Sequence, residues 1–522
     1  MQSQPAPSFV PVVRSLADLL GPAYASAAVA ARAFLAGGGP ELQAAADRRI
    51  DFFPQPLQAR LTSLLGQVGT QVVPTPLPRT AAGAGTVKFN AVTRTAAAPL
   101  SALGCFRVGE DGRLYLITKS EHYHTPLGHA FPGYSLLDQA RLLGIPNATH
   151  NNTRGFITRH LEEELVRTAN GLQRGDTAGL EAVLARQDDL RTLNRVLNLE
   201  TGSLAVEAAL KMILARFHRM QSDLPEPRYH GQKPVILVMG NDDGGLQANY
   251  HGTTMLTQVL RGMWPGLNKS LEEAGAWKVV AIRPNRIEDL DRAFAEHMSG
   301  GSRIAAFFHE IIMMNYGGRR LTREFLQHAH ALCAAHDVPT VVDEIQSCMW
   351  SSQLFLFREY GLKPTFVALG KGFPGGEYPA SRILFSSAMD VMPQFGALVT
   401  NGQEELASLA YLVTMEWAQA NAAVTAALGT HIEAGVRRLA AEFPGTVTGI
   451  DGWGHMSTIS FADRTRAEAF ASALQAQGLD LSAQSYKADC PPVVLMKLPL
   501  IADRAMIDVV LAAMRRVLAG LS

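Results

Sequence analysis

Cysteine is scarce in this chain, with four among 522 residues. Cys105, Cys333, Cys348 and Cys490 form no CxxC pair and no metal-ligand spacing, so a disulfide framework and a cysteine-based metal site are both excluded. An excess of charge of one sign is also missing, since Lys and Arg total 47 and Asp and Glu total 47. Without net charge there is no global attraction for nucleic acid or a membrane surface, and we expect neither as a partner.

From the sequence we expect neither a membrane-spanning run nor a targeting segment. The Ala-rich stretch 23–36 contains Arg32 and is too short to span a bilayer. Residues 1–5 lack the positively charged region of a signal peptide. Together with cysteines in apolar contexts, which suit a reducing compartment, these features predict a cytoplasmic protein whose partners are small molecules.

The chain does have enough length and apolar content for several domains. Its residues are 47% hydrophobic and 18% charged, which is typical of a folded protein with a large core. Helix-forming sequence, broken by glycines and ended by a proline-rich linker, predicts a helical N-terminal extension over 1–80. We expect a small domain built from 81–150 and 391–522, with a large domain over 151–390 between them.

Short, continuous apolar runs alternate with helical sequence through the central part of the chain. The runs are 235–239, 279–282, 304–308 and 338–342. A strand that is apolar at every position is typical of a parallel sheet covered by helices on both faces. The predicted fold class is therefore α/β, with a mostly parallel, helix-flanked sheet in the large domain and a smaller α+β domain.

Lys371 follows another apolar run, 366–369, and precedes a glycine-rich turn. At the edge of an apolar core desolvation disfavours the ammonium, so the amine is available to attack a carbonyl. The run at 338–342 ends in an acid, Asp343. A lysine that holds an aldehyde as a Schiff base and a carboxylate that keeps a pyridine nitrogen protonated are the two groups that a pyridoxal phosphate enzyme requires. Taken alone, Lys371 would more often be a strand-capping lysine in an unrelated α/β enzyme.

Two further stretches suit a cofactor site. Residues 201–203, Thr-Gly-Ser, precede a helix that is expected to begin near Ala205, and the free N–H groups of a helix start bind phosphate. An ordinary serine N-cap is the alternative. Residues 250–252, Tyr-His-Gly, follow the strand at 235–239 and offer a ring that could stack on a heteroaromatic cofactor. A packed core tyrosine and a satisfied histidine are the alternative there.

In their order and spacing, these segments resemble the class III (ω-) aminotransferases, which are fold-type I pyridoxal phosphate enzymes. The segments that carry the resemblance are 127–132, 198–211, 250–252, 342–346, 370–372 and 400–407. The resemblance implies the fold-type I transferase fold, pyridoxal 5'-phosphate as the cofactor, and transfer of an amino group from a small-molecule amino donor to a keto or aldehyde acceptor.

The resemblance also implies a role for the residues around the cofactor ring. Lys371 would form the Schiff base and shuttle the proton, and Asp343 would pair with the pyridine N–H through a charge-assisted hydrogen bond. Ile345 and Tyr250 would pack on opposite faces of the ring. Gln346 would donate to the ring hydroxyl.

A second group of residues would surround the cofactor phosphate. Gly202 and Ser203, with Thr400 from a second subunit, would hold it, so the resemblance implies a homodimer. His251 matches the histidine of the family's aromatic-His-Gly segment, and Glu310 matches a glutamate of the family. Both are therefore included among the predicted cofactor-binding residues.

The chain departs from the family's pattern at four places. Leu204 stands where the family has Glu, 347–351 replaces a turn with glycine and arginine, and 311–316 replaces a Pro-x-x-Gly. Near the C-terminus, many members use an arginine fork to clamp the substrate carboxylate. The corresponding residues 494–500 contain no arginine, and their one basic residue is Lys497. We expect Lys497 to be a solvated strand residue rather than a substitute for that arginine, which leaves the amino donor open.

Amino-group transfer is the leading interpretation of these residues. An aminomutase or epimerase of the same family would use the same cofactor without a second substrate. A third possibility is a catalytically silent scaffold that keeps the fold, although intact Lys371 and Asp343 argue against it. The loss of the carboxylate-binding arginine is compatible with transfer and with the mutase alternative.

Overall fold

The computed structural model describes residues 8–75, 77–78, 81–187, 189–394, 396–484 and 489–521. The chain forms two compact units. Unit 1 is built from both ends of the chain, up to Gln139 and from Glu416 onward, and unit 2 is the continuous stretch Ala140–Met415. Each unit has its own sheets and its own buried core.

Unit 2 contains a seven-stranded sheet in the order β6-β14-β13-β12-β9-β7-β8. Its strands are β6 (Arg195–Leu199), β7 (Lys233–Met239), β8 (Lys278–Ile282), β9 (Ser302–His309), β12 (Thr340–Asp343), β13 (Phe366–Leu369) and β14 (Ser381–Phe385). The strands from β13 to β8 run parallel to their neighbours, and β14 is antiparallel to β13 and β6. The central strands are buried along almost their whole length, and the predicted mostly parallel sheet is confirmed.

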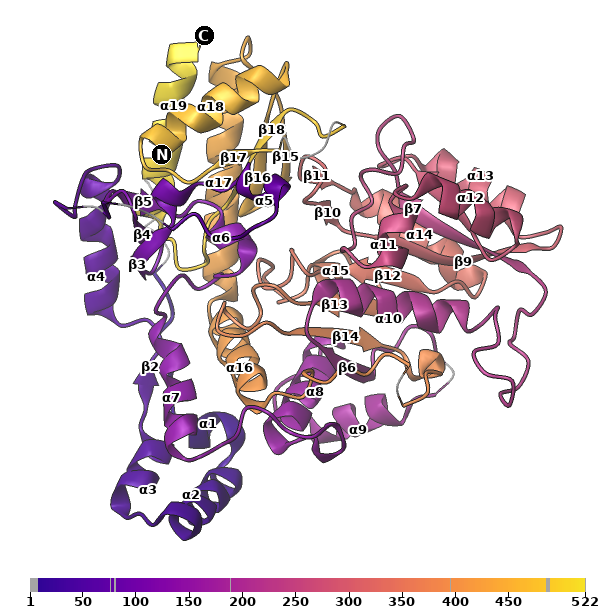
Figure 1. The fold of residues 1–522 in the computed structure, drawn as a ribbon, viewed down its shortest axis with the longest axis horizontal. Coiled ribbons are helices and arrows are strands. Elements are labelled where there is room, and N and C mark those ends of the chain that lie inside the picture. The colour runs from indigo at the N-terminus through magenta and orange to yellow at the C-terminus, as the bar shows by residue number, and fades with distance from the viewer. Residues whose placement is uncertain are drawn as a thin grey trace. The chain divides into compact units, whose positions relative to one another are not determined.

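Helices flank this sheet. They are α8 (Phe156–Ala169), α9 (Thr177–Ala185), α10 (Gly202–Leu214), α11 (Met255–Leu260), α12 (Pro265–Glu273), α13 (Ile287–His297), α14 (Arg323–Ala335) and α15 (Leu356–Glu359), with a small β10 (Ile312–Met313) and β11 (Arg319–Arg320) hairpin. Figure 1 shows α10 beside β13 and β14, and these elements share one apolar core. The helix α10 begins at Gly202, earlier than the expected start near Ala205, so Ser203 lies in its first turn.

Unit 1 has the α+β character that the sequence predicts. Its elements are the antiparallel sheet of β3 (Pro99–Leu103), β4 (Phe106–Gly109) and β5 (Leu114–Leu116), the antiparallel sheet of β15 (Val447–Trp453), β16 (Met456–Phe461), β18 (Val493–Lys497) and β17 (Ser482–Ala483), and the helices α17 (Ala422–Glu442), α18 (Arg464–Ala476) and α19 (Arg504–Leu521). The helices α7 (Ser135–Leu142) and α16 (Glu405–Ala420) each span a boundary between the units.

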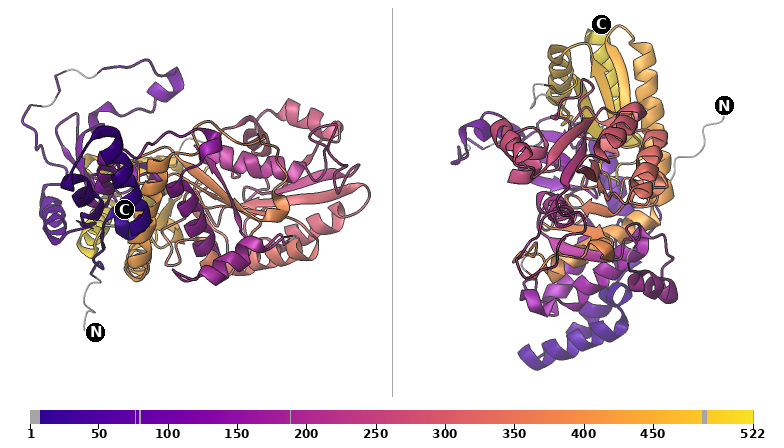
Figure 2. Two further views of the ribbon diagram at one scale, coloured as in Figure 1. Left: turned by 90° about the horizontal axis from the view of Figure 1, so that it is seen from below. Right: turned by 90° about the vertical axis from the view of Figure 1, so that its right-hand side faces the viewer.

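The N-terminal part of unit 1 is mainly helical. Its elements are β1 (Val13–Arg14), α1 (Leu16–Leu20), α2 (Pro22–Ala36), α3 (Pro40–Asp47), β2 (Ile50–Asp51), α4 (Gln55–Leu64), α5 (Val87–Asn90) and α6 (Ser120–Tyr123). The violet segment with α5 reaches away from the strands of this unit in the left view of Figure 2. Among the described residues, no helix is both long enough and apolar enough to cross a membrane.

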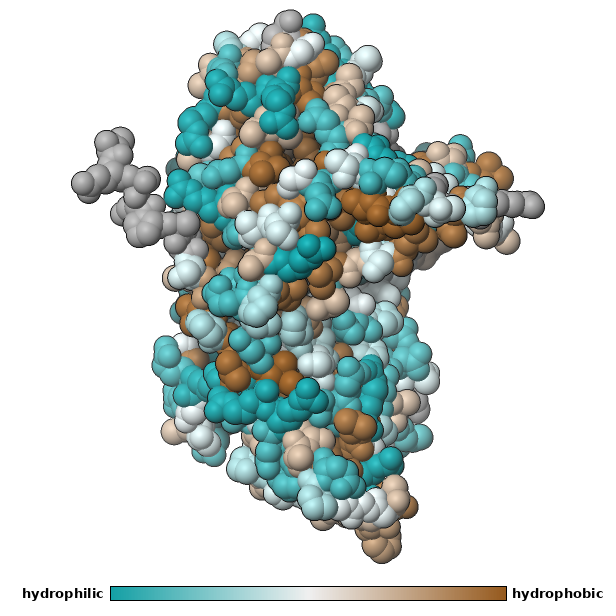
Figure 3. Space-filling model, turned by 90° about the vertical axis from the view of Figure 1, so that its left-hand side faces the viewer, coloured by the Kyte–Doolittle hydropathy of each residue, from teal (hydrophilic) through white to brown (hydrophobic). Residues whose placement is uncertain are grey.

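The helix α2 buries little of its apolar surface. Ala25 is its only buried residue, whereas Phe34 and Leu35 are 89% and 78% exposed. Figure 3 shows one face of the molecule on which apolar side chains reach the surface in patches separated by hydrophilic ones. Within the described residues, α2 therefore owes its position to its contacts with α1 and α3 rather than to a wide buried stripe.

Lys497 is not the solvated residue that we expected. It is the last residue of β18, it is fully buried, and its backbone pairs with Met456 of β16 and donates to the Thr118 carbonyl at 2.9 Å. A lysine stem of four methylene groups can line an apolar core while the ammonium finds polar neighbours. The prediction was wrong because β18 lies between β16 and β17 in its sheet and is buried at every position.

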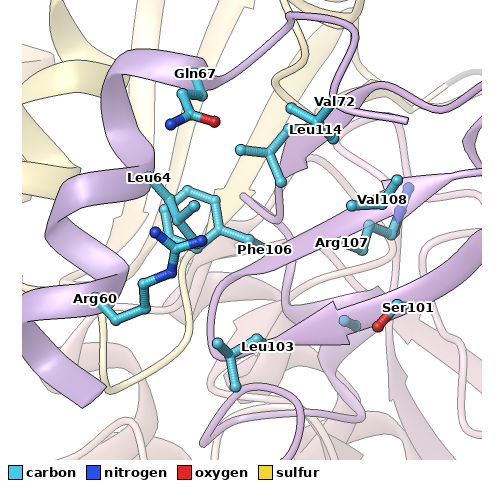
Figure 4. Close-up of a pocket in the computed structure, with 11 residues that line it drawn as sticks. Arg60, Leu64, Gln67, Val72, Ser101, Leu103, Phe106, Arg107, Val108 and Leu114 are labelled. Carbon is cyan, nitrogen blue, oxygen red and sulfur yellow. The ribbon is translucent and has the colours of Figure 1, made fainter. Parts of the chain in front are cut away.

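Unit 1 also contains an apolar cavity of about 230 Å³ between α4 and the sheet of β3, β4 and β5. Leu64 of α4 lies across this cavity from Phe106 and Leu114, and Arg60 also lines it (Figure 4). None of the predicted cofactor-binding residues lines this cavity.

Candidate active site

Lys371 and Asp343 follow neighbouring parallel strands at the same edge of the sheet. The register pairs Asp343, the last residue of β12, with Ala368 of β13, and Lys371 lies in the turn just beyond β13. That turn is closed by a hydrogen bond of 3.2 Å from the Phe373 N–H to the Gly370 carbonyl. Lys371 has a positive φ of 48°, which costs a non-glycine residue about 1–2 kcal/mol. Such strain is found where the surroundings fix a side chain for function.

The charge of Lys371 is set by burial and by two carboxylates. Burial lowers the pKa of the Lys371 ammonium from its ordinary value, because desolvation disfavours the charged form. The negative charges of Glu310 and Asp343 oppose this effect. Glu310 directly follows β9, and its Oε2 accepts from the Met314 N–H at 2.9 Å. The lowered pKa raises the fraction of neutral amine, which is the form that attacks a carbonyl.

Asp343 is buried and held by two hydrogen bonds. The Nδ1 of His251 lies 2.9 Å from one carboxylate oxygen, and the Ile345 N–H donates to the other at 3.1 Å. Because a carboxylate only accepts, His251 carries a proton on Nδ1, and a neutral ring leaves Nε2 as an acceptor. That Nε2 is buried and, within the part of the chain that the structure describes, has no hydrogen-bond partner. An unsatisfied buried atom of this kind calls for a polar group that the chain itself does not supply.

Two glycines let other segments close around the start of α10. A Cβ on Gly202 would lie 2.1 Å from Cδ1 of Ile345, and a Cβ on Gly252 would lie 2.4 Å from Oγ of Ser203. The N-cap residue makes no side-chain hydrogen bond to the helix. Leu204 and Ala205 already donate to the Thr201 carbonyl. Gly202 and Ser203 therefore offer the N–H groups that can face an anion, beside Ile345.

The remaining predicted residues lie around this group or apart from it. Tyr250 precedes His251, and the Arg261 guanidinium carbon lies 4.8 Å from the centre of its ring. Gln346 is buried in the turn after β12. Thr400 is exposed ahead of α16 and, among the residues described, makes no hydrogen bond to the other predicted site residues.

Residues 90–518 match the sequence model of a family described as aminotransferase class-III. The chain belongs to the class-III aminotransferase family. It is an enzyme of this family, and amino-group transfer is its reaction class.

Known proteins agree with this assignment. The chain is similar to the acetylornithine aminotransferase of Synechocystis sp., at 24% identity over 335 residues that cover 63% of this chain and 72% of that protein. It is 26% identical over 367 residues to the ornithine aminotransferase of Saccharomyces cerevisiae, covering 67% and 76% of the two chains. The crystal structure of the ornithine aminotransferase from Toxoplasma gondii ME49 matches with a TM-score of 0.62 and 19% identity over 81% of this chain and 90% of that one, which shows the shared fold.

Two residues of this class-III aminotransferase had no predicted role. Arg261 lies against Tyr250, and nothing in the sequence brings them together, because the contact depends on how α11 ends. Glu344 is fully buried and accepts hydrogen bonds from the backbone of Leu356 and Phe357. Its burial has no signal in the sequence, because glutamate is rarely fully buried unless it is paired.

Proposed function

We propose that this class-III aminotransferase binds pyridoxal 5'-phosphate between Lys371 and Asp343 and moves an amino group from an amine or amino acid to a keto acid or aldehyde. The observation that carries the proposal is a lysine of lowered pKa next to a buried Asp–His pair at the carboxyl edge of a parallel sheet. The names of the relatives, which include ornithine, acetylornithine and lysine-epsilon aminotransferases, support a donor with a primary amine.

The residues present fit this cofactor. The buried carboxylate of Asp343 can accept from a protonated pyridine nitrogen, and His251 holds that carboxylate from the other side. The uncapped start of α10 at Gly202 suits a phosphate group. When bound, the cofactor supplies an aldehyde that bonds to amines and a ring that withdraws electrons from the reacting carbon.

Each residue then has a defined task. Lys371 would hold the cofactor through its neutral amine, and the same amine, once free, would act as the base that takes a proton from the substrate carbon and passes it on to the cofactor. Asp343 would keep the pyridine nitrogen protonated, and His251 fixes the position of the Asp343 carboxylate through Nδ1. Glu310 adds a second negative charge near Lys371 and so limits how far the pKa of the amine falls. We also propose a cytoplasmic location, which the four free cysteines support.

A single half-reaction tests the proposed activity. The holoenzyme is mixed with a primary amine in the absence of any acceptor, and the visible absorbance of the cofactor is followed. Amino-group transfer predicts that the absorbance is lost as one equivalent of carbonyl product forms. Continued product formation without an acceptor would instead indicate a mutase or epimerase, and no change with any of a panel of amines would contradict catalysis.

Gly202→Ala is expected to weaken cofactor binding. The new methyl group would meet Ile345 at 2.1 Å, so Ile345 must move away from its position near the start of α10. Overpacking of this size costs about 1–3 kcal/mol, and we expect the cofactor dissociation constant to rise about tenfold. Gly266→Ala is the matched control, because a Cβ at Gly266 meets no atom within 4 Å. Equal cofactor affinities for the two variants would contradict a phosphate site at the start of α10.

Thr400→Ala tests the proposed homodimer. If Thr400 of each subunit completes the phosphate site of the other, neither chain alone has a whole site, and cofactor binding stabilises the dimer. Loss of one phosphate hydrogen bond should weaken cofactor affinity by about 1–2 kcal/mol while Lys371 still reacts. Thr430→Ala, on the exposed surface of α17, is the control. Sedimentation that shows a fully active monomer would contradict the proposal.

A further inference from the structure

Glu344 gathers hydrogen bonds from three parts of unit 2. It directly follows β12 and is fully buried. Its Oε2 accepts from the Leu356 N–H at 2.9 Å and from the Ser347 hydroxyl at 3.3 Å, and its Oε1 accepts from the Phe357 N–H at 2.5 Å. Its own N–H donates to the Ala368 carbonyl of β13 at 3.0 Å. One side chain thus joins the end of β12 to the first turn of α15, whose N-cap makes no side-chain hydrogen bond.

The loop between these contacts, residues 347–355, is strained, and it is buried except at Ser352 and Gln353. Met349 and Leu354 both have a φ of 65°, and the Met349 N–H donates to the Leu354 carbonyl at 2.6 Å. Glu359, at the end of α15, fastens the loop a second time, since its Oε1 accepts from the N–H and the hydroxyl of Ser352 at 2.5 and 2.7 Å. Met349 and Leu354 adopt the left-handed conformation without being glycine, so hydrogen bonds such as these are required to hold them there.

This loop packs on the turn that carries the reactive lysine. The Phe355 ring lies 6.3 Å from the ring of Phe373, which stacks on Tyr411 at 4.9 Å with an angle of 9° between the planes. Phe373 belongs to the same hydrogen-bonded turn as Lys371. A shift of the loop therefore passes through Phe355 and Phe373 to the backbone of Lys371.

We propose that ionised Glu344 is a positioning residue for Lys371, holding the 347–355 loop and with it the lysine-bearing turn in the reactive arrangement. The inference rests on the proposed function of Lys371. Each oxygen of Glu344 already accepts a backbone N–H, from Leu356 or from Phe357. A proton on either oxygen weakens these hydrogen bonds, because a neutral carboxyl is a poorer acceptor than a carboxylate and its O–H requires an acceptor of its own. Protonation thus loosens the start of α15.

The electrostatic surroundings place this protonation in the neutral range. Burial raises the pKa of Glu344 to about 7, the hydrogen bonds from Leu356, Phe357 and Ser347 oppose the rise, and the charge of Glu359 adds to it. The other titratable or charged groups on the packed elements are Asp343 on β12, Cys348 on the loop and Arg358 on α15, while β13 contributes none. The reactive arrangement is therefore lost as the pH falls through about 7.

The same pKa gives stability the opposite dependence on pH. The folded chain binds this proton more tightly than the unfolded chain, in which the pKa is near 4.5. The contribution of Glu344 to stability is therefore complete below about pH 4.5 and is lost as the pH rises through about 7. If Glu344 had a purely structural role, activity would fall as the pH rises through about 7, because stability falls. If Glu344 positions Lys371, activity rises over the same pH range. The direction of the pH profile separates the two.

The test is the pH profile of kcat for the holoenzyme and for Glu344→Gln and Glu344→Asp. The wild type should show an acidic limb with an apparent pKa near 7. The glutamine variant cannot ionise, so it should lack this limb and turn over about tenfold more slowly above pH 8, which is the scale of a small misplacement of the reacting groups. The aspartate variant keeps the charge and should keep the limb at a shifted pH. Amide hydrogen exchange at Leu356 and Phe357 should be about tenfold faster in the glutamine variant.

Glu405→Gln is the matched control. Glu405 is another buried carboxylate that accepts from two backbone N–H groups at a helix start, those of Ile157 and Thr158 at 2.8 and 3.2 Å. Its variant should lose stability but keep the acidic limb. An unchanged limb in Glu344→Gln would overturn the inference, and if that variant does not fold, an unshifted limb in Glu344→Asp would do so. Failure of borohydride to fix the cofactor on wild-type Lys371 would instead overturn the proposed function, and this inference with it.

Discussion

Lys371→Ala is expected to abolish turnover, with kcat/KM lowered by at least about a thousandfold, because the variant has no amine to bond the cofactor and no base to move the proton. The effect should be this large because Lys371 stands next to Asp343 at the sheet edge and burial lowers the pKa of its ammonium. The fold should survive, since removal of this side chain relieves the cost of keeping a partly desolvated charge.

Lys269→Ala is the control for this variant. The Lys269 side chain is 76% exposed on α12 and pairs with Glu273 at 3.7 Å, so a change there should leave both turnover and the bound cofactor unchanged. Added methylamine should restore some turnover to Lys371→Ala, because a free amine can take the place of the missing base. Normal turnover of Lys371→Ala without any added amine would contradict the assignment.

Asp343→Asn should keep the fold and most of the cofactor but lose most of the activity. The amide oxygen can still accept from His251 Nδ1 and the Ile345 N–H, which now hold the carboxylate at 2.9 and 3.1 Å. A neutral amide cannot hold a proton on the pyridine nitrogen, so the electron-withdrawing power of the ring is lost. We expect a loss of about 3–4 kcal/mol of transition-state stabilisation, which slows the reaction by hundreds-fold or more.

Asp242→Asn is the control for Asp343→Asn. It makes the same replacement of a carboxylate by an amide, at a half-exposed side chain that pairs with Arg319 at 2.8 Å. It should leave kcat/KM within about twofold of the wild type, because exposed ion pairs contribute at most about 1 kcal/mol. Absorbance of the bound cofactor shows whether Asp343→Asn retains it. Near-normal turnover by Asp343→Asn with the cofactor bound would contradict the role of this carboxylate.

The parts of the fold that sequence predicts well are those whose patterns are local. The run 235–239 is apolar at every position, and it becomes β7, a strand buried in the middle of the sheet. Asp343 and Lys371 stand at the ends of two such runs, and the carboxyl ends of parallel strands meet at one edge. Their closeness therefore follows from the strand pattern alone, before any tertiary contact is known.

The features that sequence did not predict depend on contacts between distant segments. The hydrogen bond between His251 and Asp343 joins residues far apart in the chain, and neither residue's neighbours indicate it. Lys497 was expected to be exposed, but β16 and the chain near Thr118 cover it. Glutamate is usually exposed, and the donors that bury Glu344, at the start of α15, become apparent only once the 347–355 loop is folded.

The most direct test of the central claim is to locate the cofactor on the chain. The holoenzyme is reduced with borohydride, digested, and mapped by mass spectrometry for the added pyridoxyl group. The account predicts that this group is found on the peptide that contains Lys371, and that prior treatment with a primary amine donor prevents the labelling. A pyridoxyl group on any other lysine, with Lys371 unmodified, would contradict it.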